Sequence, residues 1–429
     1  MGFGKENLVY LIITGAIFMT SCKEKDSISP TVTISLPNQG QIFNVFDTVV
    51  TRFSVTEETR LKYVFTQIVD ANFIPIGPSI PVNFSGTSFT GNVELVLDDK
   101  LLPTADYYVL VTASDGVNET REFREIKIAG VPKKRRAVFF STAGQSNLIW
   151  KIDSLFQGGF SWLAPNQDIR QICVNSLNDR LIFIGQLSTE IKAFDINSIA
   201  MIWSDNTSNV NQIQRFTDLM CYENSVYTGL FDKEIRAYNL NGALNLNRTT
   251  GNYRPEAIYV DQTYLVIEMQ LVGDDSHHVF VHSSQTHSLL WQLEVPMNIE
   301  AICPLQGDEL LLFGNDAGQA KVLHYDIGDN GWWEPRNLPA GILSDAVHLE
   351  GLNFAIAHES GLYSYTYNPN FLNMLSADNY QDIVFDVDNN TVIGAVQNTV
   401  NEVSVVNGAM INSFAQADSI TSIDIHYTR

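Results

Sequence analysis

The pentapeptide Asp218-Leu-Met-Cys-Tyr222 returns along the chain as an acidic residue followed by a mostly apolar run of residues that favour β-strands. Four more copies keep the acid and two have lost it, and together the seven are Arg170–Val174, Asp218–Tyr222, Glu256–Val260, Glu300–Pro304, Asp345–Leu349, Asp382–Asp386 and Thr421–Ile425. Their starting positions lie 37 to 48 residues apart. A period of about 40 to 45 residues, with several short strands per unit, is typical of a β-propeller blade.

Each copy is expected to be the inner strand of one unit, with further strands after it. In the first unit these are Arg180–Ile184, Glu190–Asp195 and Ala200–Trp203. The last unit has only its inner strand, residues 420–427, whereas residues 137–160 offer outer strands without an inner one. We therefore predict that these two segments pair and close a seven-bladed β-propeller over residues 137–429, because closure removes exposed sheet edges.

Two units place a tryptophan at the same spacing, in Ala193–Trp203 and Val281–Trp291. This pattern resembles the repeat of quinoprotein-like and YVTN-type propellers, in which the tryptophan packs between blades. The resemblance implies a fold, and it implies little about activity.

Residues 31–130 are predicted to form a β-sandwich, because short alternating segments are separated by turn residues at regular spacing. Leu102–Gly116 resembles the late strand pair of immunoglobulin-like and fibronectin-type-III-like domains, with a tyrosine corner at Tyr107 or Tyr108. The resemblance implies a spacer domain. The basic residues 131–136 are interpreted as a linker that contacts acidic neighbours, so the expected fold class is all-β, an immunoglobulin-like β-sandwich followed by the propeller.

Residues 1–21 have the features of a signal peptide, with a positive Lys5 and an apolar segment, Leu8–Phe18, that is too short for a membrane span. Met19-Thr-Ser-Cys22 resembles the lipobox of bacterial lipoproteins, in which the cysteine is lipidated and becomes the new N-terminus. The alternative is an ordinary secretory signal. Residues 22–30 form a polar tether, and its charged start resembles the signal that sends lipoproteins of Bacteroidetes-type bacteria to the outside of the outer membrane. We expect an anchor through lipid on Cys22 and a position facing the cell exterior.

The charge of the chain excludes some classes of partner. It has 48 acidic and 26 basic residues among 429, a formal net charge of −22. Nucleic-acid binding depends on Lys and Arg displacing counterions, so we expect no nucleic-acid partner. The sequence has no GxSxG, P-loop or HExxH motif. We therefore expect a non-catalytic binding or scaffold protein for a protein or glycan ligand, and the alternative is a carbohydrate-active or quinone-dependent propeller enzyme.

The seven motif positions are the main candidate site. If the inner strands line a central channel, their first residues form a ring at its mouth, and the ring consists of Arg170, Asp218, Glu256, Glu300, Asp345, Asp382 and Thr421. Carboxylate oxygens suit Ca²⁺ or a cationic or polyhydroxylated ligand. The alternative is that each acid caps a local turn or bonds a neighbouring blade.

Aromatic, histidine and cysteine residues supply weaker hypotheses. Trp332 and Trp333 are candidates for stacking on a sugar ring, or for packing between blades. The adjacent His277 and His278 are interpreted as exposed loop residues, because no third metal ligand is evident. Three further cysteines occupy the same place in the motif and are expected to be buried free thiols rather than a disulfide or a metal site; they are Cys173, Cys221 and Cys303.

Overall fold

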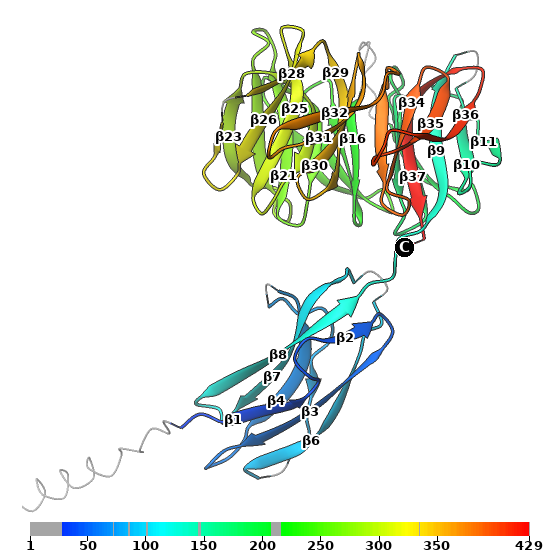
Figure 1. Cartoon of the computed structure of the whole chain (residues 1–429). Coiled ribbons are helices and arrows are strands. Elements are labelled where there is room, and N and C mark those ends of the chain that lie inside the picture. Colours follow the sequence, from blue (N-terminus) through cyan, green and yellow to red (C-terminus); the bar gives the residue numbers. More distant parts are fainter. Residues whose placement is uncertain are drawn as a thin grey trace, which may run out of the picture. The chain divides into compact units, whose positions relative to one another are not determined.

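The computed structural model describes residues 28–71, 73–84, 86–99, 102–144, 147–206, 216–333 and 335–428, and this part of the chain is all-β, with no helix (Figure 1). The chain divides into two compact units, Met1–Pro132 and Lys133–Arg429. The predicted signal peptide, Cys22 and most of the tether lie outside the described residues. The described residues contain no helical segment with the length and apolarity needed to cross a bilayer.

The first unit consists of two sheets that pack face to face. One sheet has the order β1 (Thr31–Leu36), β3 (Thr48–Thr56), β6 (Ser88–Val96), and the other has the order β2 (Gln41–Asn44), β8 (Glu119–Ala129), β7 (Ala105–Ser114), β4 (Tyr63–Val69), β5 (Ile80–Pro81). The alternation of the sequence fixes the buried face, and in β3 every second residue from Val49 to Val55 is buried or nearly so. Tyr107 is buried and its hydroxyl donates to the Pro103 carbonyl at 3.2 Å, so it makes the bond expected of a tyrosine corner.

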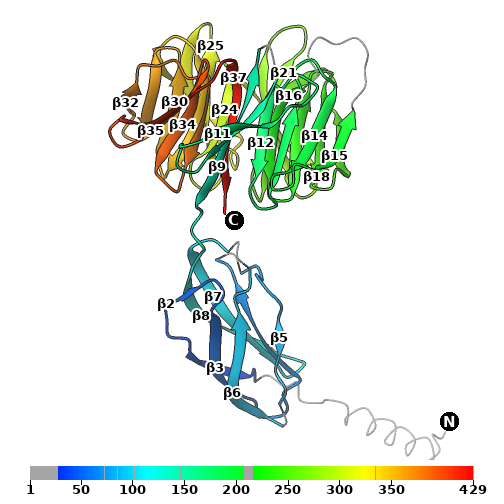
Figure 2. The ribbon, with the colours of Figure 1, turned by 90° about the vertical axis from the view of Figure 1, so that its right-hand side faces the viewer.

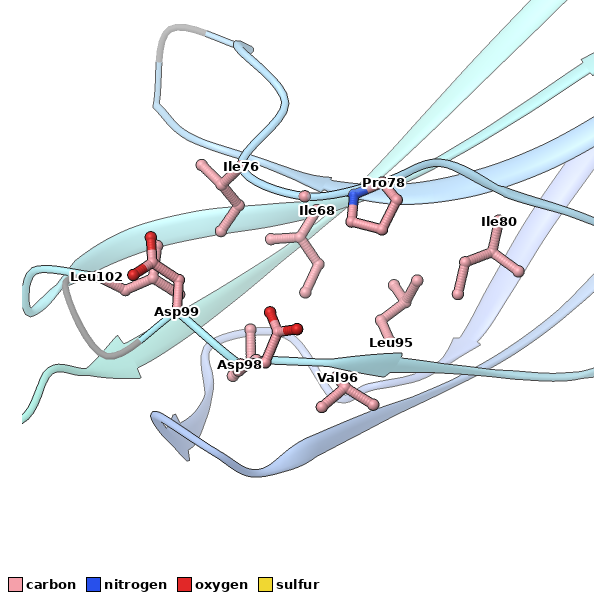
Figure 3. A pocket seen from close by; sticks show the side chains of 11 residues that line it. Ile68, Ile76, Pro78, Ile80, Leu95, Val96, Asp98, Asp99 and Leu102 are labelled. Carbon is pink, nitrogen blue, oxygen red and sulfur yellow. The ribbon is translucent and has the colours of Figure 1, made fainter.

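An apolar opening lies at one end of these two sheets, between the segment that joins β4 to β5 and the end of β6. Figure 3 shows Ile68 and Leu95 directed into it from opposite sides. Its volume is about 50 Å³. Ligand sites usually measure about 300 to 1,000 Å³, so this opening is a packing feature of the sandwich rather than a ligand site.

The second unit, within the described residues, contains seven antiparallel sheets, which we name by their inner strands. The β37 sheet has the order β11 (Gly159–Leu163), β10 (Ile149–Asp153), β9 (Arg135–Ala143), β37 (Ser419–Tyr427). The next three are β12 (Gln171–Asn175), β13 (Arg180–Ile184), β14 (Glu190–Asp195), β15 (Met201–Asn206); β16 (Phe216–Tyr222), β17 (Ser225–Leu230), β18 (Glu234–Asn239), β19 (Leu244–Thr249); and β20 (Tyr253–Val260), β21 (Tyr264–Leu271), β22 (His277–Ser283), β23 (Leu289–Val295).

The last three sheets follow the same plan, with one exception at an outer edge. They are β24 (Asn298–Pro304), β25 (Glu309–Asp316), β26 (Gln319–Asp326) with β27 (Gly331–Trp332) and β28 (Arg336–Ala340) both paired to β26; β29 (Leu343–Glu350), β30 (Asn353–His358), β31 (Gly361–Thr366), β32 (Phe371–Ser376); and β33 (Asp382–Asp386), β34 (Thr391–Val396), β35 (Thr399–Ser404), β36 (Met410–Ala415).

The seven sheets form a closed ring. Each inner strand contacts the inner strands of the sheets before and after it, from β12 through β33 to β37 and back to β12. The predicted pairing of the two chain segments is present, because β9 pairs with β37 in a register that sets Val138 opposite Ile425 (Figure 2). The hydrophobic core lies mostly between neighbouring sheets; one cluster, for example, joins Phe183 of the β12 sheet to Phe139 of the β37 sheet.

The two spaced tryptophans differ in their surroundings. Trp203 lies on β15, its indole N–H donates to the Leu240 carbonyl at 3.1 Å, and its ring stacks on Tyr238 of the neighbouring sheet. Trp291 on β23 is 44% exposed. Only Trp203 therefore packs between sheets in the way that the resemblance implies.

A buried ion network fastens the closing sheet to the sheet before it. Arg135, in the predicted linker, begins β9, and its Nη1 lies 2.8 Å from Asp386 Oδ2 and 2.6 Å from Glu402 Oε1. All three side chains are at most 4% exposed. Removing one partner of such a network leaves an uncompensated buried charge, which costs far more than an exposed pair is worth.

We expect Arg135→Met to lower the free energy of unfolding by about 3–5 kcal/mol, because two carboxylates would remain buried without their cation. Chemical denaturation followed by tryptophan fluorescence measures this loss. The control is Arg136→Met, since Arg136 is half exposed and lies 3.4 Å from Asp179; it should change stability by less than about 1 kcal/mol. Equal effects of the two substitutions would contradict a role for the network.

Candidate functional site

The predicted ring residues lie around one cavity at the ends of the inner strands. The cavity has a volume of about 400 Å³, and all seven predicted residues line it: Arg170, Asp218, Glu256, Glu300, Asp345, Asp382 and Thr421. The structure therefore brings together residues that are up to 251 positions apart in the sequence, from 170 to 421. It does not place them equivalently, however.

The motif acids occupy two different registers. In five inner strands a β-bulge inserts one residue at the cavity, and the bulged residues are Thr217, Glu256, Glu300, Ser344 and Thr421. We call this the mouth position; Arg170 and Gln381 occupy it in the other two strands. We call the next residue the bracket position, which is occupied by Gln171, Asp218, Ala257, Ala301, Asp345, Asp382 and Ser422. A linear pattern does not reveal a bulge, so the expectation of one equivalent ring is corrected here.

The three aspartates at the bracket position hold neighbouring inner strands together. Asp218 Oδ2 accepts the Ile258 N–H at 2.7 Å, Asp345 Oδ2 accepts the Ile383 N–H at 2.9 Å, and Asp382 Oδ2 accepts the Ile423 N–H at 2.8 Å. In each case the donor is the residue after the bracket position of the next strand. For these three residues the structural alternative, a bond to the neighbouring blade, describes what the side chain does.

Three side chains that the motif did not single out continue the same scheme. Gln171 Oε1 accepts the Leu219 N–H at 3.0 Å and Ser422 Oγ accepts the Ile172 N–H at 3.2 Å. One level below, Asp424 Oδ2 accepts the Val174 N–H at 2.6 Å. One feature of the sequence could have indicated Asp424: the seventh copy of the motif lacks its leading acid but has an acid three residues later.

Burial makes these carboxyls hard to ionise. It raises the pKa of Asp424 to about 7 and that of Asp382 to about 6, although backbone N–H groups favour the charged form at both. The pKa of Asp345 is raised well above its usual range by burial and by the Asp382 carboxyl. Ionising these buried carboxyls therefore costs more free energy than ionising an exposed aspartate.

The two glutamates stand at the mouth position, line the cavity, and bond to side chains rather than to a backbone N–H of the next inner strand within the described residues. Glu256 pairs with Arg254 beside it, and Glu300 accepts from Asn298 Nδ2 at 2.7 Å and Asn315 Nδ2 at 3.1 Å. Burial raises the pKa of both, and the Glu256 carboxyl raises the pKa of Glu300 further. In β20 and β24 the bracket position is occupied by Ala257 and Ala301. On this acidic side of the cavity, therefore, neither strand has a carboxylate at the bracket position.

The opposite side of the ring contributes a cation and neutral groups. Arg170 Nε donates to the Thr217 carbonyl at 3.0 Å, and burial lowers the guanidinium pKa while Asp218 and Glu256 counteract this. Thr421 Oγ1 lies 2.8 Å from Ser141 Oγ. The cavity therefore has a cationic edge at Arg170 and an acidic edge at Glu256 and Glu300.

A buried pair behind the acidic edge was missed. Glu268 on β21 is fully buried, its Oε1 lies 2.6 Å from His277 Nδ1, and its Oε2 has no hydrogen-bond partner among the described residues. Burial raises the pKa of Glu268 to about 7, and the bond to Glu268 raises the pKa of His277. His277 begins β22, so its assignment to an exposed loop was wrong; the usable signal was the single acid inside the apolar run Leu265–Met269.

The stagger between neighbouring strands also explains the cysteines. Each bracket residue lies opposite the residue that follows the bracket position of the next strand. Cys173 is two residues after its bracket residue and Cys221 is three residues after its own, so the same offset sets the two cysteines opposite each other. The structure joins the two as a disulfide, with their Cα atoms 6.1 Å apart, which corrects the expectation of free thiols. Cys303 stays a buried free thiol, and the residue that the same stagger sets opposite it is His348.

The two candidate tryptophans point in different directions. The Trp332 indole N–H donates to the Glu294 carbonyl of the neighbouring β20 sheet at 3.0 Å. Trp333 is 51% exposed, stacks on His324, and lines a second cavity with a volume of about 470 Å³. Trp332 therefore packs between sheets, whereas Trp333 is available to a ligand.

Asp424→Asn removes a carboxyl whose pKa is higher in the folded chain than the value of about 3.9 expected in the unfolded chain. The folded state thus binds this proton more tightly, and the contribution to stability is complete below about pH 4 and is lost as pH rises through about 7. We expect the unfolding free energy of the wild type, measured relative to the variant in urea melts, to fall between about pH 4 and 8.

The control is Asp274→Asn in an exposed turn, where hydrogen bonds from Ser276 lower the pKa of the aspartate. A group whose pKa is lowered on folding has the opposite effect on the pH dependence of stability, because its contribution is lost only as pH falls towards the acid range. The difference between wild type and this variant should stay constant between about pH 5 and 8. The same downward trend for both variants would refute the assignment to Asp424.

No protein-family model and no curated protein match the sequence. Solved structures are similar in fold: a Bacteroides fragilis protein described as a 6-phosphogluconolactonase (11% identity, TM-score 0.52, 68% of this chain and 98% of that chain covered), the WD40 repeats of RRP9 (10%, 0.52, 66% and 88%) and hydrazine synthase of Kuenenia stuttgartiensis (11%, 0.52, 62% and 91%). At these identities the similarity shows fold alone. The chain therefore has an all-β, propeller-like fold.

Proposed function

We propose that this chain is a lipid-anchored cell-surface binding protein, whose ring of seven sheets is a seven-bladed β-propeller that recognises a protein or glycan ligand without catalysis. The observation that carries the proposal is the division of the ring residues into two registers. Glu256 and Glu300 face a cavity of about 400 Å³, and in the described part of the chain no backbone N–H of a neighbouring inner strand donates to their carboxyls. Such a cavity suits a ligand that presents a positive charge together with hydrogen-bonding groups.

The positive charge has two possible sources, an organic ammonium or guanidinium group and Ca²⁺. The described residues contain no group of three His, Cys, Asp or Glu side chains placed to hold a metal ion. Glu256 and Glu300 would hold Ca²⁺ with water in most coordination positions, since Ca²⁺ takes six to eight oxygen ligands. A lysine or arginine side chain of a partner, or an amino sugar, needs only one or two carboxylates and favours the organic form.

The first unit fits a spacer with an immunoglobulin-like fold. Its two packed sheets, antiparallel except for the parallel pairing of β2 with β8, and the Tyr107 hydrogen bond support this assignment. Its small apolar opening leaves no room for a ligand. In this proposal the unit carries the propeller at a distance from the lipid on Cys22, which rests on the sequence resemblance alone.

The alternative of a carbohydrate-active or quinone-dependent enzyme gains less support from the cavity. An enzyme needs a nucleophile or an acid–base pair within reach of its substrate. The pair Glu268 and His277 is close to the cavity, but neither residue lines it. The two tryptophans whose spacing resembles that of quinoprotein-like propellers are not equivalent, because Trp203 packs between sheets and Trp291 is exposed.

Thermal unfolding tests whether the central cavity binds a cation. The protein that lacks residues 1–22 is heated with Ca²⁺, with EDTA, or with spermidine. A ligand at a hundred times its Kd should stabilise by about 2.7 kcal/mol. We expect the double variant Glu256→Gln/Glu300→Gln to lose that shift. Spermidine alone raising Tm would indicate an organic cation, and Ca²⁺ alone would indicate a metal.

The matched control is Glu58→Gln/Glu94→Gln, which removes the same charge from exposed positions of the first unit. It should retain the full shift, because nonspecific screening of the net charge would act equally on both variants. A shift that survives in Glu256→Gln/Glu300→Gln would refute the cavity as the binding site.

Membrane fractionation tests the anchor. We expect the full-length chain, expressed in a Bacteroidetes host, to sediment with the outer membrane and to be accessible to protease on intact cells. Cys22→Ala should release it or block its maturation, because lipidation requires the thiol. A mature protein that begins before Cys22 or carries no lipid by mass spectrometry would contradict the anchor.

A further inference from the structure

The β24 sheet departs from the other six sheets at its outer edge. Within the described residues, each of the others has one continuous outer strand, whereas here β27 pairs with Tyr325 and Asp326, and β28 pairs with Lys321 and Val322. Between these two pairings the Trp333 N–H donates to the His324 carbonyl at 3.0 Å. The interruption opens the second cavity, which is lined by Val322, His324, Trp333, Arg336 and Tyr367.

One wall of this cavity is an aromatic surface that is fixed by its own contacts. The Trp333 indole stacks on the His324 imidazole with ring centroids 4.0 Å apart and planes 18° apart. His324 Nδ1 lies 2.7 Å from the Tyr367 hydroxyl, and His324 Nε2 faces Glu309 Oε2 at 3.4 Å. Burial lowers the pKa of His324 although Glu309 counteracts this, and the hydrogen bond to Tyr367 holds the imidazole ring in place. The exposed indole is thus held in place before any ligand arrives.

The other wall presents the guanidinium of Arg336, which pairs with no carboxylate among the described residues. Arg336 Nη1 donates to the Tyr367 carbonyl at 2.8 Å, and the guanidinium carbon lies 4.5 Å from the centre of the Tyr367 ring. Among the described residues, no acidic side chain pairs with Arg336, although acids outnumber bases 48 to 26 in the chain. A guanidinium carries five N–H donors in a planar fork that matches a carboxylate.

These observations define a ligand by two features at once. The exposed face of Trp333 suits the apolar face of a ring, and Arg336 suits an anionic group on the edge of that ring. A volume of about 470 Å³ lies within the range of small-molecule sites. We propose that the cavity formed by His324, Trp333, Arg336 and Tyr367 binds a sugar ring that carries a carboxylate, as a second site separate from the central cavity.

Isothermal titration calorimetry with tetragalacturonate tests the proposal on the protein that lacks residues 1–22. We expect saturable binding to the wild type. Trp333→Ala should weaken it by about tenfold or more, as should Arg336→Met, because each removes one of the two recognised features. The control Trp291→Ala removes an exposed tryptophan of β23 that lines neither cavity, and it should bind like the wild type.

Two further arms identify the ligand class. A neutral tetrasaccharide, maltotetraose, should bind more weakly than tetragalacturonate to the wild type and about equally to wild type and Arg336→Met. Benzoate carries a carboxylate on a flat aromatic ring, and tighter binding of benzoate than of galacturonate would overturn the assignment to a sugar.

Two further results would overturn the proposal. One is that the wild type shows no saturable binding of tetragalacturonate, and the other is that Trp333→Ala and Arg336→Met bind it as tightly as the wild type does. Glu256→Gln/Glu300→Gln should leave tetragalacturonate binding unchanged. Loss of binding in that double variant would move the ligand to the central cavity, so failure of this inference and failure of the proposed function can be distinguished.

Discussion

The structure of the second unit depends on one constraint, which is that the innermost strand of every sheet has an unpaired edge. The N–H groups along that edge face a narrow interior, where an unsatisfied backbone donor costs free energy. The chain meets this requirement with side chains from the preceding sheet, namely the amide of Gln171, the carboxyls of Asp218, Asp345 and Asp382, and the hydroxyl of Ser422. The ring is closed by these side-chain bonds as much as by the pairing of β9 with β37.

The same scheme determines where the molecule has chemical freedom. A carboxyl whose two oxygens both accept backbone N–H groups, as those of Asp218 and Asp345 do, has less capacity left for a ligand. Where alanine replaces the bracket residue, at Ala257 and Ala301, the bulged glutamate beside it is left with its carboxyl towards the cavity. Two adjacent positions of one motif therefore have different roles: the bracket position holds neighbouring strands together, and the mouth position before it lines the candidate site.

Much of the fold followed from the sequence, because strand position depends on local patterns that repeat. The inner strands, the all-β class and the pairing of residues 137–160 with 420–427 were predictable from period and alternation. The bulges were not, since an extra residue leaves the apolar pattern of the strand nearly unchanged. For the same reason, the disulfide between Cys173 and Cys221 was missed: its pairing depends on a stagger between sheets that no single strand records. Glu268 and His277 meet only through the register of β21 against β22, and the second cavity arises from a broken outer strand that no motif marks.

The pairing of β9 with β37 sets the order of events during synthesis. These strands stand at opposite ends of the second unit, and Phe140 meets Ile423, 283 positions further along the sequence. Contacts of such long range are slow to form, because the whole loop between them must be ordered first. The nascent unit therefore leaves the ribosome with β9 lacking its partner, an open edge rich in apolar residues. Until its last strand is in place, that edge can pair with another chain, and closure of the ring removes this hazard.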